Sequence, residues 1–172
     1  MAEEDGSKSN RARLSRIVVG VDGSQISFRA LEWAAREASL RGATLEVVHV
    51  TLLNQDAMEL DSLAALKRRE SAIIDDAVAK ASAVAPSIIV VARVADPPAS
   101  DALVNVSRDA DLLVVGSRGL GLFKEFALGS VSQDCARQAQ CPLVIIGPRT
   151  VTSGPYSDAS AKRAPGPAAD RT

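Results

Sequence analysis

Five short apolar runs constrain the fold of this chain more than any other feature of its sequence. Each run is almost continuously hydrophobic, whereas a strand with one solvated face would alternate apolar and polar residues. Uninterrupted runs of Val, Ile and Leu are typical of strands that are buried on both faces of a parallel sheet. They lie at residues 17–21, 45–50, 88–94, 112–115 and 143–146.

The segments between these runs have the spacing of amphipathic helices. Gly42 is well placed to end the first helix, because glycine readily adopts the left-handed conformation of a helix C-terminus. Asp96, Pro97 and Pro98 predict an N-cap followed by prolines in the first helical turn. The expected helices are residues 27–41, 62–85, about 97–108, and a last one from 130 or 132 to 138.

Alternating strands and helices predict an α/β fold with a doubly wound, five-stranded parallel sheet between two helical layers. We expect one folded domain at residues 15–148, with disordered tails at 1–14 and 149–172. The C-terminal tail is rich in Ser, Ala, Pro and Gly and has no apolar stripe. Ligands of such folds bind beyond the carboxyl ends of the strands, where the strand order reverses.

Composition narrows the classes of partner. Lys and Arg number 20 against 21 Asp and Glu, so the net charge of -1 offers no positive field for nucleic acid. No apolar run is long enough to cross a bilayer and no signal peptide is visible, so we expect a cytoplasmic protein with no membrane partner. Cys135 and Cys141 are interpreted as small buried side chains, and the single histidine, His49, as a core or rim residue. We expect no metal site built from protein side chains.

A glycine-rich loop after the fourth run carries the strongest chemical signal. It begins Gly116-Ser117-Arg118-Gly119 and ends Gly129-Ser130-Val131-Ser132. Glycines let backbone N–H groups approach an anion, and the helix that opens at Ser130 adds its N-terminal N–H groups and dipole. Arg118 and Ser132 are further candidate phosphate contacts. The loop therefore predicts a phosphate site.

Two familiar phosphate motifs do not fit this loop. A Walker A loop requires Gly-Lys-Ser/Thr, and here Gly129 is followed directly by Ser130. The dinucleotide fingerprint belongs after the first strand, where this chain reads Gly20-Val21-Asp22-Gly23-Ser24. Taken alone, the loop leaves open that its glycines only shape a strand-to-helix connection.

Three segments together resemble the universal stress protein family: residues 20–24, 110–119 and 141–146. ATP-binding members of that family carry Gly, two residues, Gly, nine residues, then Gly-Ser/Thr. Gly116, Gly119, Gly129 and Ser130 match this spacing without a gap. The resemblance covers about residues 15–148 and implies the adenine nucleotide alpha-hydrolase-like fold with strand order 3-2-1-4-5.

The resemblance also implies an ATP site. Asp22 and Val50 would contact the adenosine, Gly116 and Gly119 the ribose and phosphates, and Gly129, Ser130 and Val131 the phosphates. Gly20 stands where some relatives have proline. Asp22 could also cap the following helix.

The resemblance implies a stress-response protein that binds ATP, with Mg²⁺, and is not an enzyme beyond weak hydrolysis. Some relatives with similar loops prefer cyclic AMP, so a cyclic AMP-binding protein is the first alternative, and a nucleotide-free dimeric interaction module is the second. The family commonly pairs through its last strand, which predicts a homodimer through residues 143–146.

Overall fold

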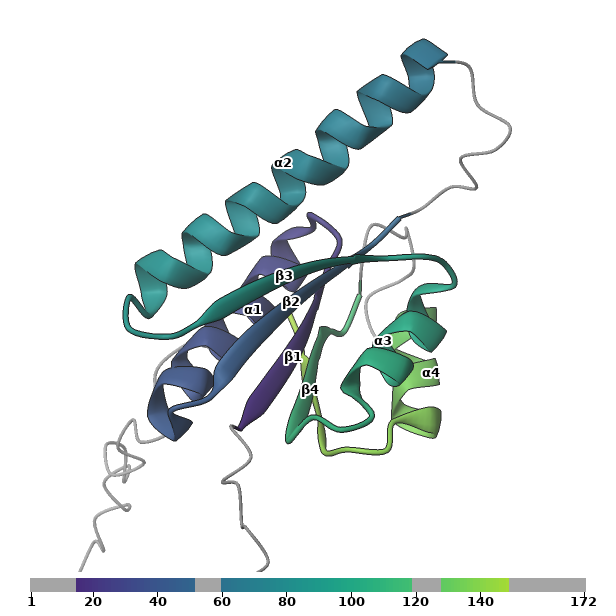
Figure 1. Cartoon of the computed structure of the whole chain (residues 1–172). Helices are drawn as coiled ribbons and strands as arrows, with labels where there is room; N and C mark the ends of the chain where they lie inside the picture. The colour runs from purple at the N-terminus through teal and green to yellow at the C-terminus, as the bar shows by residue number, and fades with distance from the viewer. Residues whose placement is uncertain (1–14, 52–59, 119–127, 149–172) are drawn as a thin grey trace, which may run out of the picture.

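The computed structural model describes residues 15–51, 60–118 and 128–148. Its strands form one five-stranded parallel sheet (Figure 1). The sheet order is β3-β2-β1-β4-β5, as predicted. The predicted tails, residues 1–14 and 149–172, lie outside the described residues. The strands are β1 (Arg16–Val21), β2 (Thr44–Val50), β3 (Val90–Ala95), β4 (Leu112–Gly116) and β5 (Leu143–Ile146).

Helices cover both faces of the sheet, which confirms the predicted three layers (Figure 1). α1 and α2 lie on one face, and α3 and α4 lie on the other. None of the helices in these described ranges is long and apolar enough to cross a membrane. The helices are α1 (Gln25–Arg41), α2 (Leu60–Val84), α3 (Ala99–Ser107) and α4 (Ser130–Gln138).

The first helix packs closely on the sheet because its buried face is made mostly of alanine. Five of its side chains are completely buried against β1, β2 and β4: Ala30, Leu31, Ala34, Ala35 and Ala38. Gly42 ends the helix with φ of 61°, and its N–H donates to the carbonyls of Ala38 and Ser39. Both the apolar stripe and the glycine stop agree with the sequence pattern.

The third strand differs from the prediction in position and in burial. We expected a strand buried on both faces at residues 88–94, whereas β3 spans Val90–Ala95 and its four central residues are exposed. Val91 and Val94 are 44% and 52% exposed. β3 lies at the edge of the sheet, so its apolar run reflects β propensity more than burial.

The start of the third helix also differs from the prediction. Pro98 is the N-cap, with extended backbone and no side-chain cap hydrogen bond, and helical residues begin at Ala99. Asp96 is therefore not the cap, and the two prolines precede the helix instead of forming its first turn. The residue before a proline is biased toward extended backbone, which explains why the helix cannot include Pro97.

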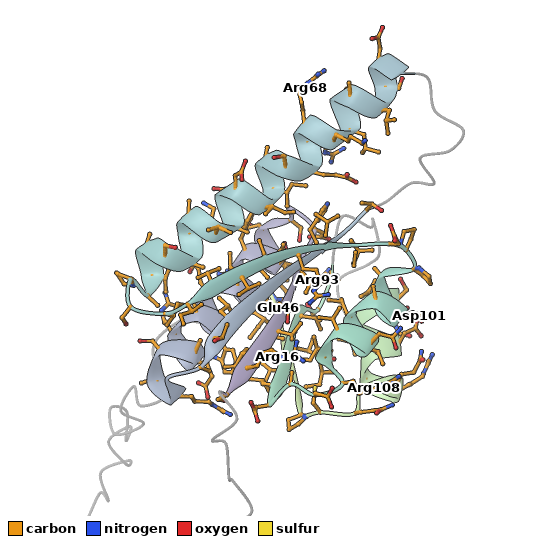
Figure 2. The ribbon with its side chains drawn as sticks, in the orientation of Figure 1. Arg16, Glu46, Arg68, Arg93, Asp101 and Arg108 are labelled. Atoms are coloured by element: carbon orange, nitrogen blue, oxygen red, sulfur yellow. The ribbon has the colours of Figure 1, made fainter. Side chains whose placement is uncertain are left out.

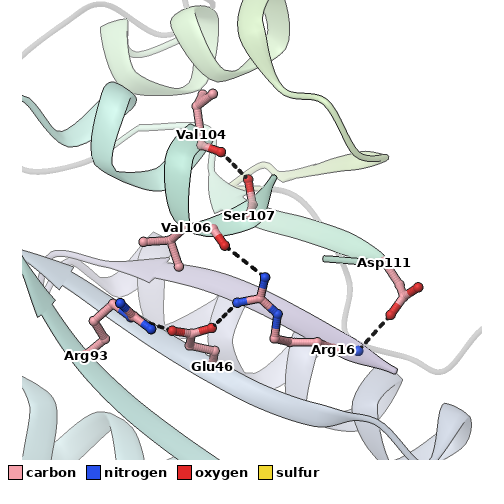
Figure 3. A network of polar contacts seen from close by, with 7 residues as sticks. All are labelled: Arg16, Glu46, Arg93, Val104, Val106, Ser107 and Asp111. Atoms are coloured by element: carbon pink, nitrogen blue, oxygen red, sulfur yellow. Dashed lines mark hydrogen bonds and ion pairs between the residues drawn. The ribbon is translucent and has the colours of Figure 1, made fainter. Parts of the chain in front are cut away.

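A buried carboxylate joins β1, β2 and β3 on the face covered by α3 (Figures 2 and 3). The side chain of Glu46 in β2 is 5% exposed. Its Oε2 accepts from Nη1 of Arg16 and its Oε1 accepts from Nε of Arg93, both at 2.5 Å. Arg16 also donates to the carbonyl of Val106 at 3.0 Å. Two guanidinium groups therefore satisfy both oxygens of one buried charge.

Replacement of Arg16 should show how much unfolding free energy is lost when the buried charge of Glu46 lacks one of its donors. The Arg16→Met variant should lose about 1–3 kcal/mol of unfolding free energy, because one oxygen of Glu46 loses its donor. The double variant Arg16→Met/Glu46→Leu should recover most of that loss, since apolar residues often replace a buried ion pair at little cost. Urea denaturation measures both. A double variant as unstable as the sum of its single changes would contradict this account.

Of the two free cysteines, both predicted to be buried, Cys135 is completely buried, whereas Cys141 is only half-buried. Burial, followed by the nearby Asp134 and Cys141, raises the pKa of the Cys135 thiol from 9.0 to about 11. A thiol is ionised only above its pKa, so the folded chain holds this proton at a pH where the unfolded chain releases it. Cys135 therefore contributes stability that is present below about pH 9 and lost as the pH rises toward 11.

A pH series should reveal this linkage. Between pH 9 and 11 the wild-type protein should lose about 1–2 kcal/mol more unfolding free energy than Cys135→Ala, in which the titrating group is missing. The measurement is urea denaturation at each pH under reducing conditions. Parallel pH curves for the two proteins would rule out the linkage.

Candidate functional site

The carboxyl ends of β1 and β4 lie side by side at the centre of the sheet. From β1 the chain continues into α1 on one face, and from β4 it continues toward α4 on the other face (Figure 1). The two connections therefore diverge, and the edge between them is the point where a doubly wound sheet accepts ligands. Asp22 and Ser117, which directly follow these strands, are brought together there.

Side-chain hydrogen bonds hold the turn after β1 in place. Oδ1 of Asp22 accepts from the N–H of Ser24 at 2.9 Å, and Oγ of Ser24 accepts from the N–H of Ser27 at 3.1 Å. Ser24, not Asp22, is therefore the N-cap of α1. Gly23 has φ of +83°, a conformation that favours glycine. The turn fixes the half-buried Asp22 at the edge of the sheet.

β2 ends beside this turn. Val50 is its last residue and is 7% exposed, and the N–H of the next residue, Thr51, donates to the carbonyl of Ala95 at 3.0 Å. His49 is 1% exposed, and its Nδ1 lies 2.9 Å from the carbonyl oxygen of Val21. The prediction of a core histidine is confirmed, and this contact ties the ends of β1 and β2 together.

The peptide of Ser117 fixes both ends of the glycine-rich loop. Its N–H donates to the carbonyl of Ile146 at 2.8 Å, and its carbonyl accepts from the N–H of Gly129 at 2.7 Å. The hydroxyl of Ser132 lies 3.1 Å from the same carbonyl and 2.9 Å from the carbonyl of Gly129. The loop therefore leaves β4 and returns to α4 at one point. The Ser132 hydroxyl therefore serves to hold the two ends of the loop together.

α4 presents its N-terminus at the same point. Gly129 is the N-cap and, as a glycine, supplies no side-chain cap hydrogen bond. The first N–H groups of a helix have no acceptor within the helix, and here those of Ser130 and Val131 belong to this first turn. Ser130 is exposed and Val131 is half-buried. This geometry is suited to an anion, because the N–H groups and the helix dipole both attract negative charge.

Two of the predicted glycines are required by packing. A Cβ on Gly116 would lie 2.9 Å from Cγ2 of Ile26, and one on Gly20 would lie 3.0 Å from Cδ1 of Leu103. These residues let helices approach the ends of β4 and β1, whether or not a ligand is bound. Gly119 lies outside the described residues. Arg118, the last described residue before that gap, is half-buried.

The sequence analysis missed Ser117 as the residue that closes the loop. Its role depends on backbone contacts with residues 12 and more positions away, which no local pattern reveals. It also missed Glu70 of α2, which lies near the end of β2. Within the described ranges, no group of three or more His, Cys, Asp or Glu side chains could hold a metal ion.

Comparison with known sequences agrees with this architecture. Residues 14–147 match the model of the universal stress protein family. The universal stress protein Rv2623 of Mycobacterium tuberculosis (strain ATCC 25618 / H37Rv) is 37% identical over 138 residues, which cover 76% of this chain and 46% of that protein. The chain thus spans about half the length of the curated relatives it matches.

Solved structures lead to the same family. A universal stress protein in complex with cAMP superposes with a TM-score of 0.63 at 29% identity, covering 77% of this chain and 96% of that chain. A universal stress protein from Archaeoglobus fulgidus superposes with a TM-score of 0.61 at 27% identity, covering 77% and 93%. The fold is thereby confirmed as adenine nucleotide alpha-hydrolase-like. This chain belongs to the universal stress protein family.

Proposed function

We propose that this chain binds ATP at the carboxyl edge of its sheet and acts as a regulatory nucleotide-binding protein in a stress response. The observation that carries the proposal is the N-terminus of α4, which the hydrogen bond from the N–H of Gly129 to the carbonyl of Ser117 holds beside the end of β4. Family members are nucleotide-binding proteins in general, which supports an adenine nucleotide at this edge.

We assign the phosphates to the start of α4. The N–H groups of Ser130 and Val131 and the exposed hydroxyl of Ser130 are suited to phosphate oxygens. The N–H of Gly129 is already bonded to Ser117, so at this position the glycine contributes the absence of a side chain. Arg118 and Gly119 stay proposed contacts of the phosphates. Ser132 we assign to loop closure instead.

We assign the adenosine to the ends of β1 and β2. The carboxylate of Asp22 can accept hydrogen bonds from ribose hydroxyls, and the backbone at Val50 can reach the base. Gly20 and Gly116 keep the helices close to these strand ends and so shape the site indirectly.

We propose that Mg²⁺ accompanies ATP through the phosphate oxygens and that the chain is a cytoplasmic binding protein, not an enzyme. The metal would then need no ligand from a protein side chain, in keeping with the way Mg²⁺ retains waters and binds nucleotide phosphates. Binding of ATP would act through a change of conformation or of partner.

Cyclic AMP is the second candidate ligand, and one observation favours it. The structural relative at 29% identity is a complex with cAMP. Both nucleotides present adenosine and a phosphate, so the described residues fit either one. They differ in charge and in the length of the phosphate chain, which a binding experiment distinguishes.

We also propose a homodimer through β5, the strand at one edge of the sheet. The N–H of Leu113 donates to the carbonyl of Pro142, and the N–H of Ser117 donates to the carbonyl of Ile146. The backbone groups of even-numbered residues in β5 therefore point toward β4. The N–H groups of Leu143 and Ile145 therefore point away from the sheet. An open edge of this kind can pair with the same strand of a second chain.

Nucleotide released from the purified protein tests the main proposal. The protein, purified without added ligand and then denatured, should release ATP, and calorimetry should show tighter binding of ATP than of cyclic AMP. Released cyclic AMP, or tighter binding of it, would replace ATP with the second candidate. Binding of neither nucleotide would contradict the function.

The variant Ser130→Asp sharpens this test. A carboxylate in the first turn stabilises a helix but repels phosphate, so affinity for ATP should fall about tenfold or more while the melting temperature does not fall. Gln138→Glu adds the same charge at the other, exposed end of α4 and should leave affinity unchanged. Equal affinities in the two variants would place the phosphates elsewhere.

The variant Ile145→Pro tests the dimer. Proline removes an N–H that points away from the sheet, so the domain should fold as a monomer. Val144→Pro, the matched control, removes a hydrogen bond to β4 and should destabilise the domain. Light scattering after size-exclusion chromatography measures the mass, and thermal melting measures the stability. A folded dimeric Ile145→Pro protein would exclude pairing through β5.

A further inference from the structure

A cavity lies between α2 and the carboxyl ends of β2 and β3. Its volume is about 320 Å³, which is at the lower end of the range for small-molecule sites. α2 contributes one face of the helix, with residues spaced i, i+3, i+4 and i+7. The lining residues are Thr51, Lys67, Glu70, Ser71, Ile74 and Val94.

The cavity contains a buried carboxylate with unused hydrogen-bonding capacity. Glu70 is 7% exposed, and its Oε1 is buried with no hydrogen-bond partner among the described residues. Lys67 and Ser71 line the same cavity but are exposed, so the cavity opens toward solvent on their side. The adjacent Arg68 points away from the sheet (Figure 2). A buried carboxylate oxygen requires a donor, and a ligand that enters this cavity can supply one.

The cavity adjoins the part of the site that we assign to adenosine. Thr51 directly follows Val50 at the end of β2. On the other side, a Cβ added to Gly23 would lie 3.2 Å from Ile73 of α2, which places the Asp22 turn against the helix beside Ile74. Oε1 of Glu70 lacks a donor, and a phosphate oxygen is an acceptor that cannot supply one. A nucleobase is the part of the nucleotide that fits.

We propose that this cavity receives the nucleobase and that Glu70 selects adenine through its exocyclic amino group. The inference rests on the proposed nucleotide-binding function. The amino group of adenine donates hydrogen bonds, which Oε1 of Glu70 accepts. Hypoxanthine carries a carbonyl oxygen at the same position, and two acceptors facing each other in a buried cavity repel. Glu70 is thus a specificity-determining residue of the site.

Binding of ATP and of inosine triphosphate to the full chain tests this inference, because the two ligands differ only at C6, which carries an amino group or a carbonyl oxygen, and at the neighbouring N1, which is protonated only in hypoxanthine. The wild-type protein should prefer ATP. In Glu70→Leu the ratio of the two affinities should fall about tenfold or more, mainly through weaker binding of ATP. In Glu70→Gln the preference should nearly vanish, since an amide can donate to the carbonyl as well as accept from the amine.

Asp76→Asn is the matched control. Asp76 lies on the same helix, is exposed and pairs with Lys80 at 3.4 Å, so this variant removes one negative charge away from the cavity. Its affinity ratio should equal that of the wild-type protein, and circular dichroism should show that all four proteins are folded. Calorimetry supplies the affinities.

The outcomes separate the inference from the function on which it rests. If the wild-type protein binds neither nucleotide, both fail. If it binds ATP and inosine triphosphate equally, or if Glu70→Leu keeps the wild-type ratio, the function stands and the role of Glu70 is overturned. A change in melting temperature without a change in the ratio would show that Glu70 is structural, for instance as a partner of Lys67.

Discussion

The pairing of β1 with both β2 and β4 is the constraint on which the rest of the structure depends. Because all three strands are parallel, their carboxyl ends meet at one edge, and segments almost a hundred residues apart come together there. His49 reinforces the pairing of β1 with β2 through the carbonyl of Val21. Val50, Asp22 and Ser117 therefore lie at or directly after the ends of these strands, and the start of α4 is held beside them by the hydrogen bond from the N–H of Gly129 to the carbonyl of Ser117.

Sequence periodicity was sufficient to predict the elements of this fold but not the environment of each one. Apolar runs identify strands wherever the side chains are β-branched, so β1, β2 and β4 were found and are buried as expected. β3 has the same composition, but its position at the sheet edge leaves Val91 and Val94 exposed. Edge position is a property of the whole topology, and a single run carries no information about it.

Sequence patterns could indicate residues of the candidate site that end or directly follow a strand, as Val50 and Asp22 do, and one that opens a helix, as Ser130 does. Contacts that close the site over longer separations were not predictable, and the carbonyl of Ser117 is the clearest case. Glu70 did leave a signal that the sequence analysis overlooked. It lies between Leu66 and Ile73 on the apolar stripe of α2, where a charged residue is out of place in a purely structural helix.

Two buried glutamates of this domain show how structure separates a structural charge from one available to a ligand. Glu46 and Glu70 are 4% and 7% exposed, so both pay a similar desolvation cost. Arg16 and Arg93 donate to the two oxygens of Glu46, so each oxygen has a partner within the fold. Oε1 of Glu70, in contrast, receives no hydrogen bond from any described residue, and a cavity lies beside it. Burial is the same in the two cases, and it is the supply of donors that assigns one carboxylate to the fold and leaves the other to a ligand.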